Sequence, residues 1–245
     1  MTQDNSAQST MSKQKPKLKW VMLEGNPEVW NKMIHENGVD EKWCFYDIYG
    51  FDQESLSTLP RPISAIIFLY PYNDLSRQFI KEEKEKFIQE GQQDNSVSDK
   101  VMFFEQTIGN ACGMMALIHA LANNKEVLGP GLFHDIVTKA EKMTVDERIE
   151  LLESNEQLAI VHKGAALSGQ TEPPTADTKD SHCYACFTNI DGHIYELDGS
   201  KGFPINHGSS NDFVESAVRV LGEFIQRDPT CTGFSAMALA KSSEQ

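Results

Sequence analysis

The chain has 245 residues, of which 40% are hydrophobic and 24% charged, as is typical of a globular protein with one domain or two small ones. Its 22 Lys and Arg against 36 Asp and Glu give a net charge of −14, which argues against nucleic-acid binding but allows a basic protein partner. The longest apolar run, Ile63–Pro71, is too short for a membrane helix, so we expect no membrane partner.

Residues 1–17 are rich in Ser, Gln and Lys and lack apolar periodicity, which predicts a disordered tail ahead of one folded domain at 18–245. No apolar segment of the signal-peptide kind follows the lysines of this tail. An odd number of cysteines without an export signal indicates reduced thiols, so we expect a cytoplasmic location, with the nucleus as a second compartment. The cysteines are Cys44, Cys112, Cys183, Cys186 and Cys231.

The first half of the chain alternates predicted helices and strands. Residues 26–28 (Asn-Pro-Glu) combine a capping residue, a first-turn proline and an acid, which predicts a helix that ends near Gly38. Ile63–Tyr70 is apolar and bounded by prolines, which indicates a buried strand. The charged segment Arg77–Glu90 predicts an exposed helix with a solvated face, and Val101–Glu105 predicts a strand.

Helical patterns follow at Cys112–Ala122, Leu132–Lys142 and Val145–Ser154, the last opened by a capping box at Thr144-x-x-Glu147. Ser168–Ser181 has no periodicity, and a loop of this length is often a lid or a binding loop.

The second half contains a predicted hairpin. Its strands are His182–Ile190 and His193–Asp198, joined by an Asp191-Gly192 turn. A helix at Asp212–Arg227 and a strand at Phe234–Ala240 complete the chain. Mixed helices and strands with an antiparallel hairpin predict an α+β fold.

Cys112 is the candidate nucleophile. It lies where a helix begins after a turn, and the unpaired N–H groups of a helix start favour a thiolate and can bind an oxyanion. The amide of Gln106 adds a second candidate donor. On position alone, the alternative is a buried, inert cysteine.

A cysteine nucleophile needs a base, usually histidine. His119 lies seven residues along the same helix, about 10 Å away along the axis, so we interpret it as a core histidine. His182 and Asp198 lie near one end of the hairpin. A two-residue turn places Ala185 opposite Asp198, so a bulge or strand twist must close about 10 Å between His182 and Asp198. The alternative is an ordinary strand-end histidine and a turn aspartate.

Several motifs together resemble the ubiquitin carboxy-terminal hydrolases, which are small, single-domain cysteine deubiquitinases. They span about residues 19–239 and lie at 23–29, 59–62, 106–120 (QTIGNACGMMALIHA), 182, 191–199 (DGHIYELDG) and 203–208. The resemblance implies a catalytic domain at 18–245 with a papain-like fold, in which helices flank a central antiparallel sheet and the backbone is knotted. It implies no cofactor and no metal ion. Cys183-x-x-Cys186 lacks a second ligand pair for zinc.

The resemblance also assigns roles within the site. Cys112 is the implied nucleophile, His182 the general base and then acid, Asp198 the orienter of His182, and Gln106 the oxyanion donor. One spacing departs from the family: eight residues separate His182 from Asp191, one more than in familiar members. We expect the extra residue to form a bulge in the hairpin.

The implied function is hydrolysis after the C-terminal glycine of ubiquitin, releasing small or disordered adducts because the 168–181 loop limits the leaving group. Glu24, Glu28 and Asp47 resemble acids of the family's ubiquitin-binding surface, although each is otherwise an ordinary surface acid. We expect a monomer. The alternatives are a catalytically inactive ubiquitin-binding module and a hydrolase that prefers a ubiquitin-like modifier.

Overall fold

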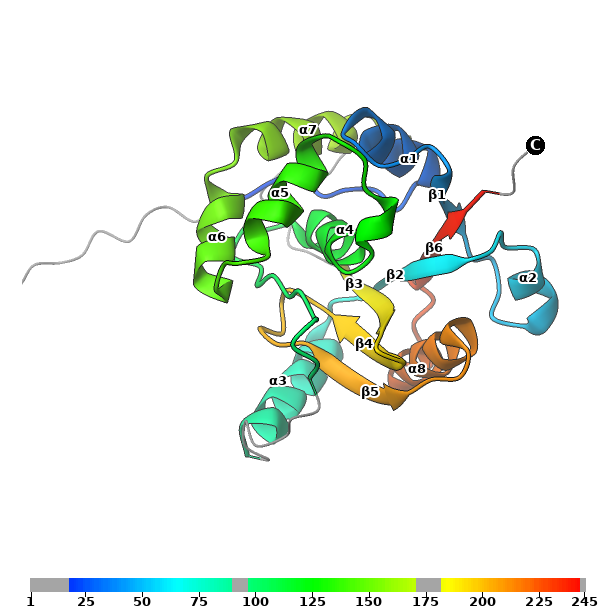
Figure 1. Ribbon diagram of the computed structural model, residues 1–245. Helices are drawn as coiled ribbons and strands as arrows, with labels where there is room; N and C mark the ends of the chain where they lie inside the picture. Colours follow the sequence, from blue (N-terminus) through cyan, green and yellow to red (C-terminus); the bar gives the residue numbers. More distant parts are fainter. Residues whose placement is uncertain (1–17, 90–96, 171–181, 243–245) are drawn as a thin grey trace, which may run out of the picture.

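The computed structural model describes residues 18–89, 97–170 and 182–242. Its centre is a six-stranded antiparallel sheet with the order β1-β6-β2-β3-β4-β5 (Figure 1). The strands are β1 (Trp43–Asp47), β2 (Ile63–Pro71), β3 (His182–Ile190), β4 (His193–Leu197), β5 (Ile205–Ser209) and β6 (Ser235–Lys241). The predicted tail at 1–17 lies outside the described residues.

Helices flank this sheet, which confirms the predicted α+β class with a central antiparallel sheet; the knot stays a prediction. They are α1 (Pro27–Glu36), α2 (Gln53–Ser57), α3 (Asp74–Gln89), α4 (Cys112–Ala122), α5 (Leu132–Ala140), α6 (Val145–Glu153), α7 (Glu156–Ala166) and α8 (Phe213–Arg227), with a short 3₁₀ helix, η1 (Lys125–Val127). Within the described ranges, none of these helices is both long and apolar enough to cross a bilayer.

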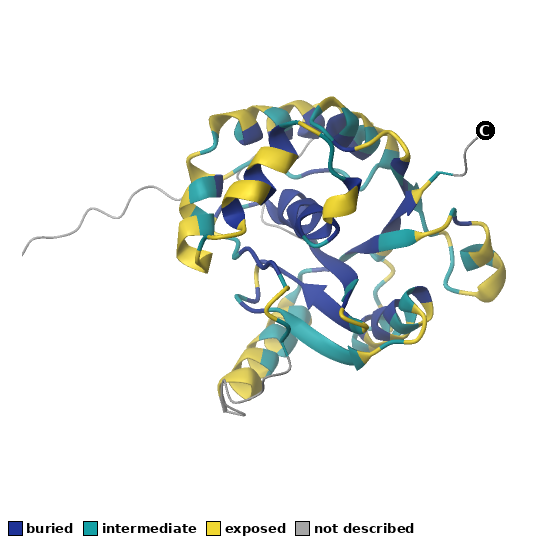
Figure 2. Cartoon of the chain, in the orientation of Figure 1, coloured by how far each residue is buried: buried dark blue, intermediate teal, exposed yellow. Residues whose placement is uncertain are grey.

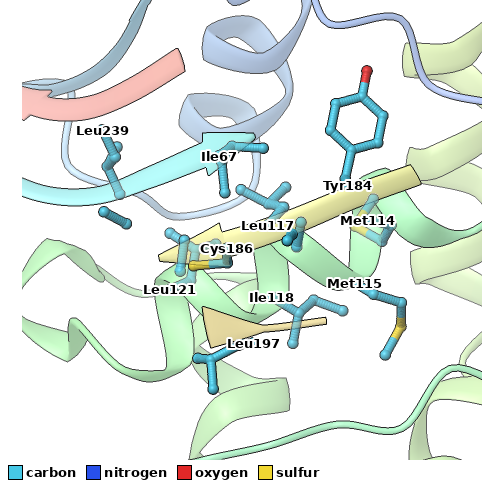
Figure 3. Close-up of a cluster of buried hydrophobic side chains, with 14 of the residues drawn as sticks. Ile67, Met114, Met115, Leu117, Ile118, Leu121, Tyr184, Cys186, Leu197 and Leu239 are labelled. Carbon is cyan, nitrogen blue, oxygen red and sulfur yellow. The ribbon is translucent and has the colours of Figure 1, made fainter. Parts of the chain in front are cut away.

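The two faces of the sheet are covered by different helices. Every residue of α4 is buried, and Figure 2 shows this helix as the dark centre of the molecule. Tyr184 and Cys186 of β3 pack with α4 side chains such as Leu117 (Figure 3). On the other face Phe187, the next residue of β3 after Cys186, packs edge-on against Phe224 of α8, with 6.1 Å between ring centroids. Adjacent residues of one strand therefore contact different helices.

The helix starts follow the sequence signals. The Asn26 side chain accepts a hydrogen bond from the Glu28 N–H, and Pro27 occupies the first position of α1. Thr144 and Glu147 form the capping box of α6. Capping is local, so these helix starts could be predicted without knowing the fold.

The predicted strand at Val101–Glu105 is wrong. This segment has no assigned secondary structure and is largely buried, and it bonds side chains of α4 and of the cap residue after it instead of a neighbouring strand. The Met102 N–H donates to the Asn123 side chain at 2.8 Å, and the Phe104 N–H donates to the His119 imidazole at 3.0 Å. A buried backbone needs hydrogen-bond partners, but these need not be another strand.

The hairpin register is confirmed, and the expected bulge is absent from it. Cys186 lies opposite Leu197 and Ile190 opposite His193, with no register shift between them. Asp191 and Gly192 both have positive φ, 52° and 79°, as a two-residue type I′ turn requires. The β2–β3 ladder is also continuous, from Ala65 opposite Thr188 to Pro71 opposite His182. No bulge absorbs the extra residue, so His182 is displaced by one position along β3 relative to the family's spacing.

Candidate active site

Cys112 is the first residue of α4 and is 6% exposed. The turn before it contains Asn110 in a left-handed conformation, with φ of 62°. Ala111, at the cap position, makes no side-chain capping bond, so the helix start leaves its first N–H groups to another partner. The place of Cys112 at a buried helix start is therefore as the sequence predicts.

The thiol that meets Cys112 belongs to Cys183. The interaction with Cys112, followed by burial, raises the pKa of the Cys183 thiol well above its ordinary value. Two contacts hold Cys183 in this place. Its cross-strand neighbour is Tyr70, and the next residue, Tyr184, packs on Gly113, where a Cβ would lie 3.4 Å from the ring. The start of β3 is thereby fixed against the start of α4.

The His182 imidazole lies elsewhere, beside Gly233 and Cys231. A Cβ built on Gly233 would come within 2.7 Å of His182 Nε2 and 3.7 Å of Cys231 Sγ. Successive side chains of a strand point to opposite faces, so His182 and Cys183 cannot both face Cys112 in this register. Counted back from Asp191 with the family's spacing, the base position falls on Cys183.

The Asp198 carboxylate accepts hydrogen bonds from Tyr70 and Ser200. Its Oδ2 accepts a 2.5 Å hydrogen bond from the Tyr70 hydroxyl, and its Oδ1 accepts from the Ser200 N–H at 2.8 Å and the Ser200 hydroxyl at 2.7 Å. Burial raises the pKa of the Asp198 carboxyl, although Lys201 and these hydrogen bonds act in the opposite direction. Tyr70 thus bonds one oxygen of the carboxylate and Ser200 the other.

A buried group of charges supports β4, the strand that Asp198 directly follows. Lys201 Nζ lies 2.5 Å from Glu196 and 2.6 Å from Glu83, and both Glu196 and the Lys201 side chain are at most 1% exposed. His207 bonds Glu196 at 2.9 Å, and Arg227 reaches Glu83 at 3.1 Å. Glu83 belongs to α3, most of whose described residues are exposed as predicted, so Glu83 is a part of this helix that faces the protein instead of solvent. A buried lysine needs carboxylate partners, and one of them comes from this helix.

Gln106 lies beside the Asp198 segment. Its N–H donates to the Gly199 carbonyl at 2.9 Å, and its side-chain Nε2 donates to the Ile108 carbonyl at 3.1 Å. A Cβ on Gly199 would come within 2.9 Å of the Gln106 Cβ, so the close approach of the two segments requires glycine there. The Oε1 of Gln106 is buried and has no hydrogen-bond partner among the described residues.

The three predicted ubiquitin-binding acids differ in their surroundings. Glu24 accepts a hydrogen bond from the Gln170 N–H at 2.7 Å, so its carboxylate holds the start of the predicted loop, whose residues 171–181 lie outside the described part. Glu28 is exposed in the first turn of α1. Asp47 ends β1, and burial raises the pKa of its carboxyl.

The interpretation of His119 is confirmed. His119 is fully buried and bonds the Phe104 backbone, and burial lowers its pKa to about 3, as expected for a core histidine. Cys183 and Cys186 are free thiols three positions apart on one strand. In the described ranges, no group of three or more His, Cys, Asp or Glu is arranged to hold a metal ion.

A cysteine at the start of a buried helix, packed against an antiparallel sheet, is the arrangement expected of a papain-like thiol hydrolase. Residues 20–226 match the model of the family described as ubiquitin carboxyl-terminal hydrolase, family 1. The chain therefore belongs to the ubiquitin carboxyl-terminal hydrolase family, a family of cysteine-protease deubiquitinases.

Individual relatives agree with this assignment. The chain is 38% identical to human ubiquitin carboxyl-terminal hydrolase isozyme L1 over 226 residues, 90% of this chain and 98% of that protein. It is 36% identical to a ubiquitin carboxyl-terminal hydrolase of Drosophila melanogaster over 230 residues, 93% and 100% of the two chains. The fold is similar to that of the Trichinella spiralis UCH37 catalytic domain bound to ubiquitin vinyl methyl ester, with a TM-score of 0.72 and 23% identity over 91% and 96% of the chains.

Sequence reasoning missed Cys183 and Tyr70 as neighbours of the candidate nucleophile and of Asp198. One available signal pointed to Cys183: the His182–Asp191 spacing, which is one residue longer than the family's. No sequence signal indicated the Tyr70 hydrogen bond, because β2 and β4 are far apart in the chain.

Proposed function

We propose that this chain hydrolyses small or disordered adducts from the C-terminal glycine of ubiquitin, with Cys112 as the nucleophile. The observation that carries the proposal is the buried Cys112 thiol at the uncapped start of α4. Cys112 would attack the glycine carbonyl and form a thioester, and water would then release ubiquitin. The Cys112 N–H and Gln106 Nε2 would stabilise the oxyanion, since the Gln106 amide has two N–H donors and its bond to the Ile108 carbonyl uses one of them.

The proposed base is His182, acting from a rearranged strand start. A local bulge at the first two residues of β3 would exchange the places of His182 and Cys183 while the rest of the ladder stays paired. Such a bulge costs about 1 kcal/mol for each ladder hydrogen bond that breaks. Pro71, opposite His182, has no N–H to lose. Turnover would then depend on how often the strand start is bulged.

The proposed substrate surface contains the three acids Glu24, Glu28 and Asp47, two of which lie close to β6. Glu24 lies just before Gly25, which approaches Ser235 at the start of β6, and Asp47 pairs with Met237 of that strand. Glu28 lies along a cleft between α1 and α7. These acids suit the arginine-bearing C-terminal tail of ubiquitin, and the net charge of −14 favours encounter with a basic partner. The solved relative that binds a ubiquitin derivative supports ubiquitin as the partner.

Removal of the nucleophile tests the proposal. Cys112→Ala should abolish release of a fluorophore from a ubiquitin C-terminal amide, while binding of ubiquitin stays within about threefold. Cys186→Ala is the matched control, because Cys186 is also a buried thiol and packs elsewhere with α4, and it should retain turnover. Unchanged turnover by Cys112→Ala would refute the proposal.

A second function is favoured by Cys183 in the base position: binding of ubiquitin without turnover. A chain of this kind would bind ubiquitin yet show no cysteine-dependent release at micromolar enzyme. Side-by-side assays with amides of ubiquitin and of ubiquitin-like modifiers would also identify the preferred modifier.

A further inference from the structure

Two thiols share the buried centre of the candidate site, and the hydrolysis proposed above uses only one. Cys112 and Cys183 are 6% and 5% exposed, respectively, and both are free. The Cys183 thiol makes its side-chain hydrogen bond with Cys112, while the Asp198 carboxylate, which also acts on Cys183, accepts from Tyr70 and Ser200.

The backbone on each side of the pair is held firmly. Cys183 belongs to a strand that pairs with β2 from His182 to Thr188, and Cys112 begins a helix that is buried throughout. The packing of Tyr184 on Gly113 joins the residues that follow each thiol. A disulfide forms readily only where two side chains already converge, and this arrangement supplies the convergence.

We propose that Cys112 and Cys183 are a modification site, at which a peroxide converts the two thiols into a reversible intramolecular disulfide. This inference goes beyond the proposed hydrolysis and uses the same nucleophile.

The reaction proceeds in two balanced steps. The Cys112 sulfur attacks one oxygen of hydrogen peroxide; an S–O bond forms, the O–O bond breaks, and water leaves after proton transfer. The Cys183 thiol then loses its proton and attacks the sulfenic sulfur, so that an S–S bond forms and a second water leaves. The two sulfurs lose two electrons and the peroxide gains them. Because the pKa of the Cys183 thiol is raised, Cys183 is a poor first target and serves as the resolving thiol.

The disulfide would protect the nucleophile from irreversible oxidation. A sulfenic acid with no resolving thiol proceeds to sulfinic and sulfonic acids, which ordinary thiols do not reduce. With Cys183 beside it, Cys112 would instead form a disulfide, which a dithiol can reduce back to the two free thiols.

The experiment treats the full chain with a small excess of hydrogen peroxide, blocks free thiols, and maps the peptides by mass spectrometry. We expect a Cys112–Cys183 cross-link and at least about a tenfold loss of labelling by ubiquitin vinyl methyl ester, both reversed by dithiothreitol. In Cys183→Ala and Cys183→Ser, labelling should be lost without recovery, with Cys112 found as sulfinic or sulfonic acid. Cys186→Ala should behave as the wild type.

Two results would overturn the inference: absence of the cross-link at peroxide concentrations that block labelling, or equal recovery of the Cys183 variants after reduction. The peptide map does not depend on ubiquitin. A cross-linked chain that never reacted with the ubiquitin probe before oxidation would therefore refute the proposed function and leave the disulfide standing.

Discussion

The candidate site has two halves, and the sequence motifs predict the positions of the residues in one half better than in the other. The helix half, Gln106 to Gly113, is placed as its motif predicts. The strand half, comprising the start of β3 and Asp198, contains the predicted residue types in a different arrangement: Cys183 faces Cys112, Tyr70 bonds Asp198, and His182 lies by Gly233. A helix start is defined by local signals, whereas a one-residue change in strand phase turns each side chain to the other face.

The largest expected effect comes from returning an imidazole to the strand half. Cys183→His places a base beside Cys112 without a bulge, so kcat/KM for a ubiquitin C-terminal amide should rise by about 10²-fold or more. Cys183→Asn has a similar shape and no basic nitrogen, and it should show no such gain. Equal rates for the two variants would mean that position 183 does not face the nucleophile.

The next effect concerns the buried charges that support Asp198. Glu196→Gln leaves Lys201 with one carboxylate fewer, and we expect a loss of about 3 kcal/mol in the free energy of unfolding, measured with urea at pH 7. The exposed Arg219–Glu223 pair provides the control, since Glu223→Gln should change stability by less than about 1 kcal/mol.

The same substitution has a predicted pH dependence. Lys201 and His207 lower the pKa of Glu196 from 4.5 to about 2 in spite of its burial. The folded pKa lies below the unfolded one, so the contribution of the carboxylate is present above pH 4.5 and is lost as the pH falls toward 2. The stability difference between wild type and Glu196→Gln should shrink over this range; a constant difference would contradict the account.

The smallest effect comes from the hydroxyl on Asp198. Tyr70→Phe removes one hydrogen bond to a buried carboxylate and should cost about 1–3 kcal/mol of stability. Combined with Cys183→His, it should raise turnover further, because Asp198 becomes free to orient the imidazole. Tyr184→Phe removes another buried hydroxyl, which bonds the Leu23 carbonyl at 3.1 Å, and should give no gain in rate.

Much of the fold could be predicted because its signals are local: the Asn26 and Thr144 caps, the Asp191-Gly192 turn and the apolar run of β2. The short strands β1 and β5 carry weak patterns and were not predicted. In the site, Cys112 and Gln106 could be placed from their motif. The partner of Cys112 could not be placed, because it depends on where β3 begins to pair with β2, which is a long-range property.

The double variant His182→Ala/Cys183→His tests most directly which side chain of the strand faces Cys112. Hydrolysis of the ubiquitin amide by this variant should match that of Cys183→His alone and exceed the wild type by about 10²-fold, since the imidazole at 183 needs no help from 182. A rate no higher than that of His182→Ala alone would contradict the account and place the working imidazole at His182 in the resting enzyme.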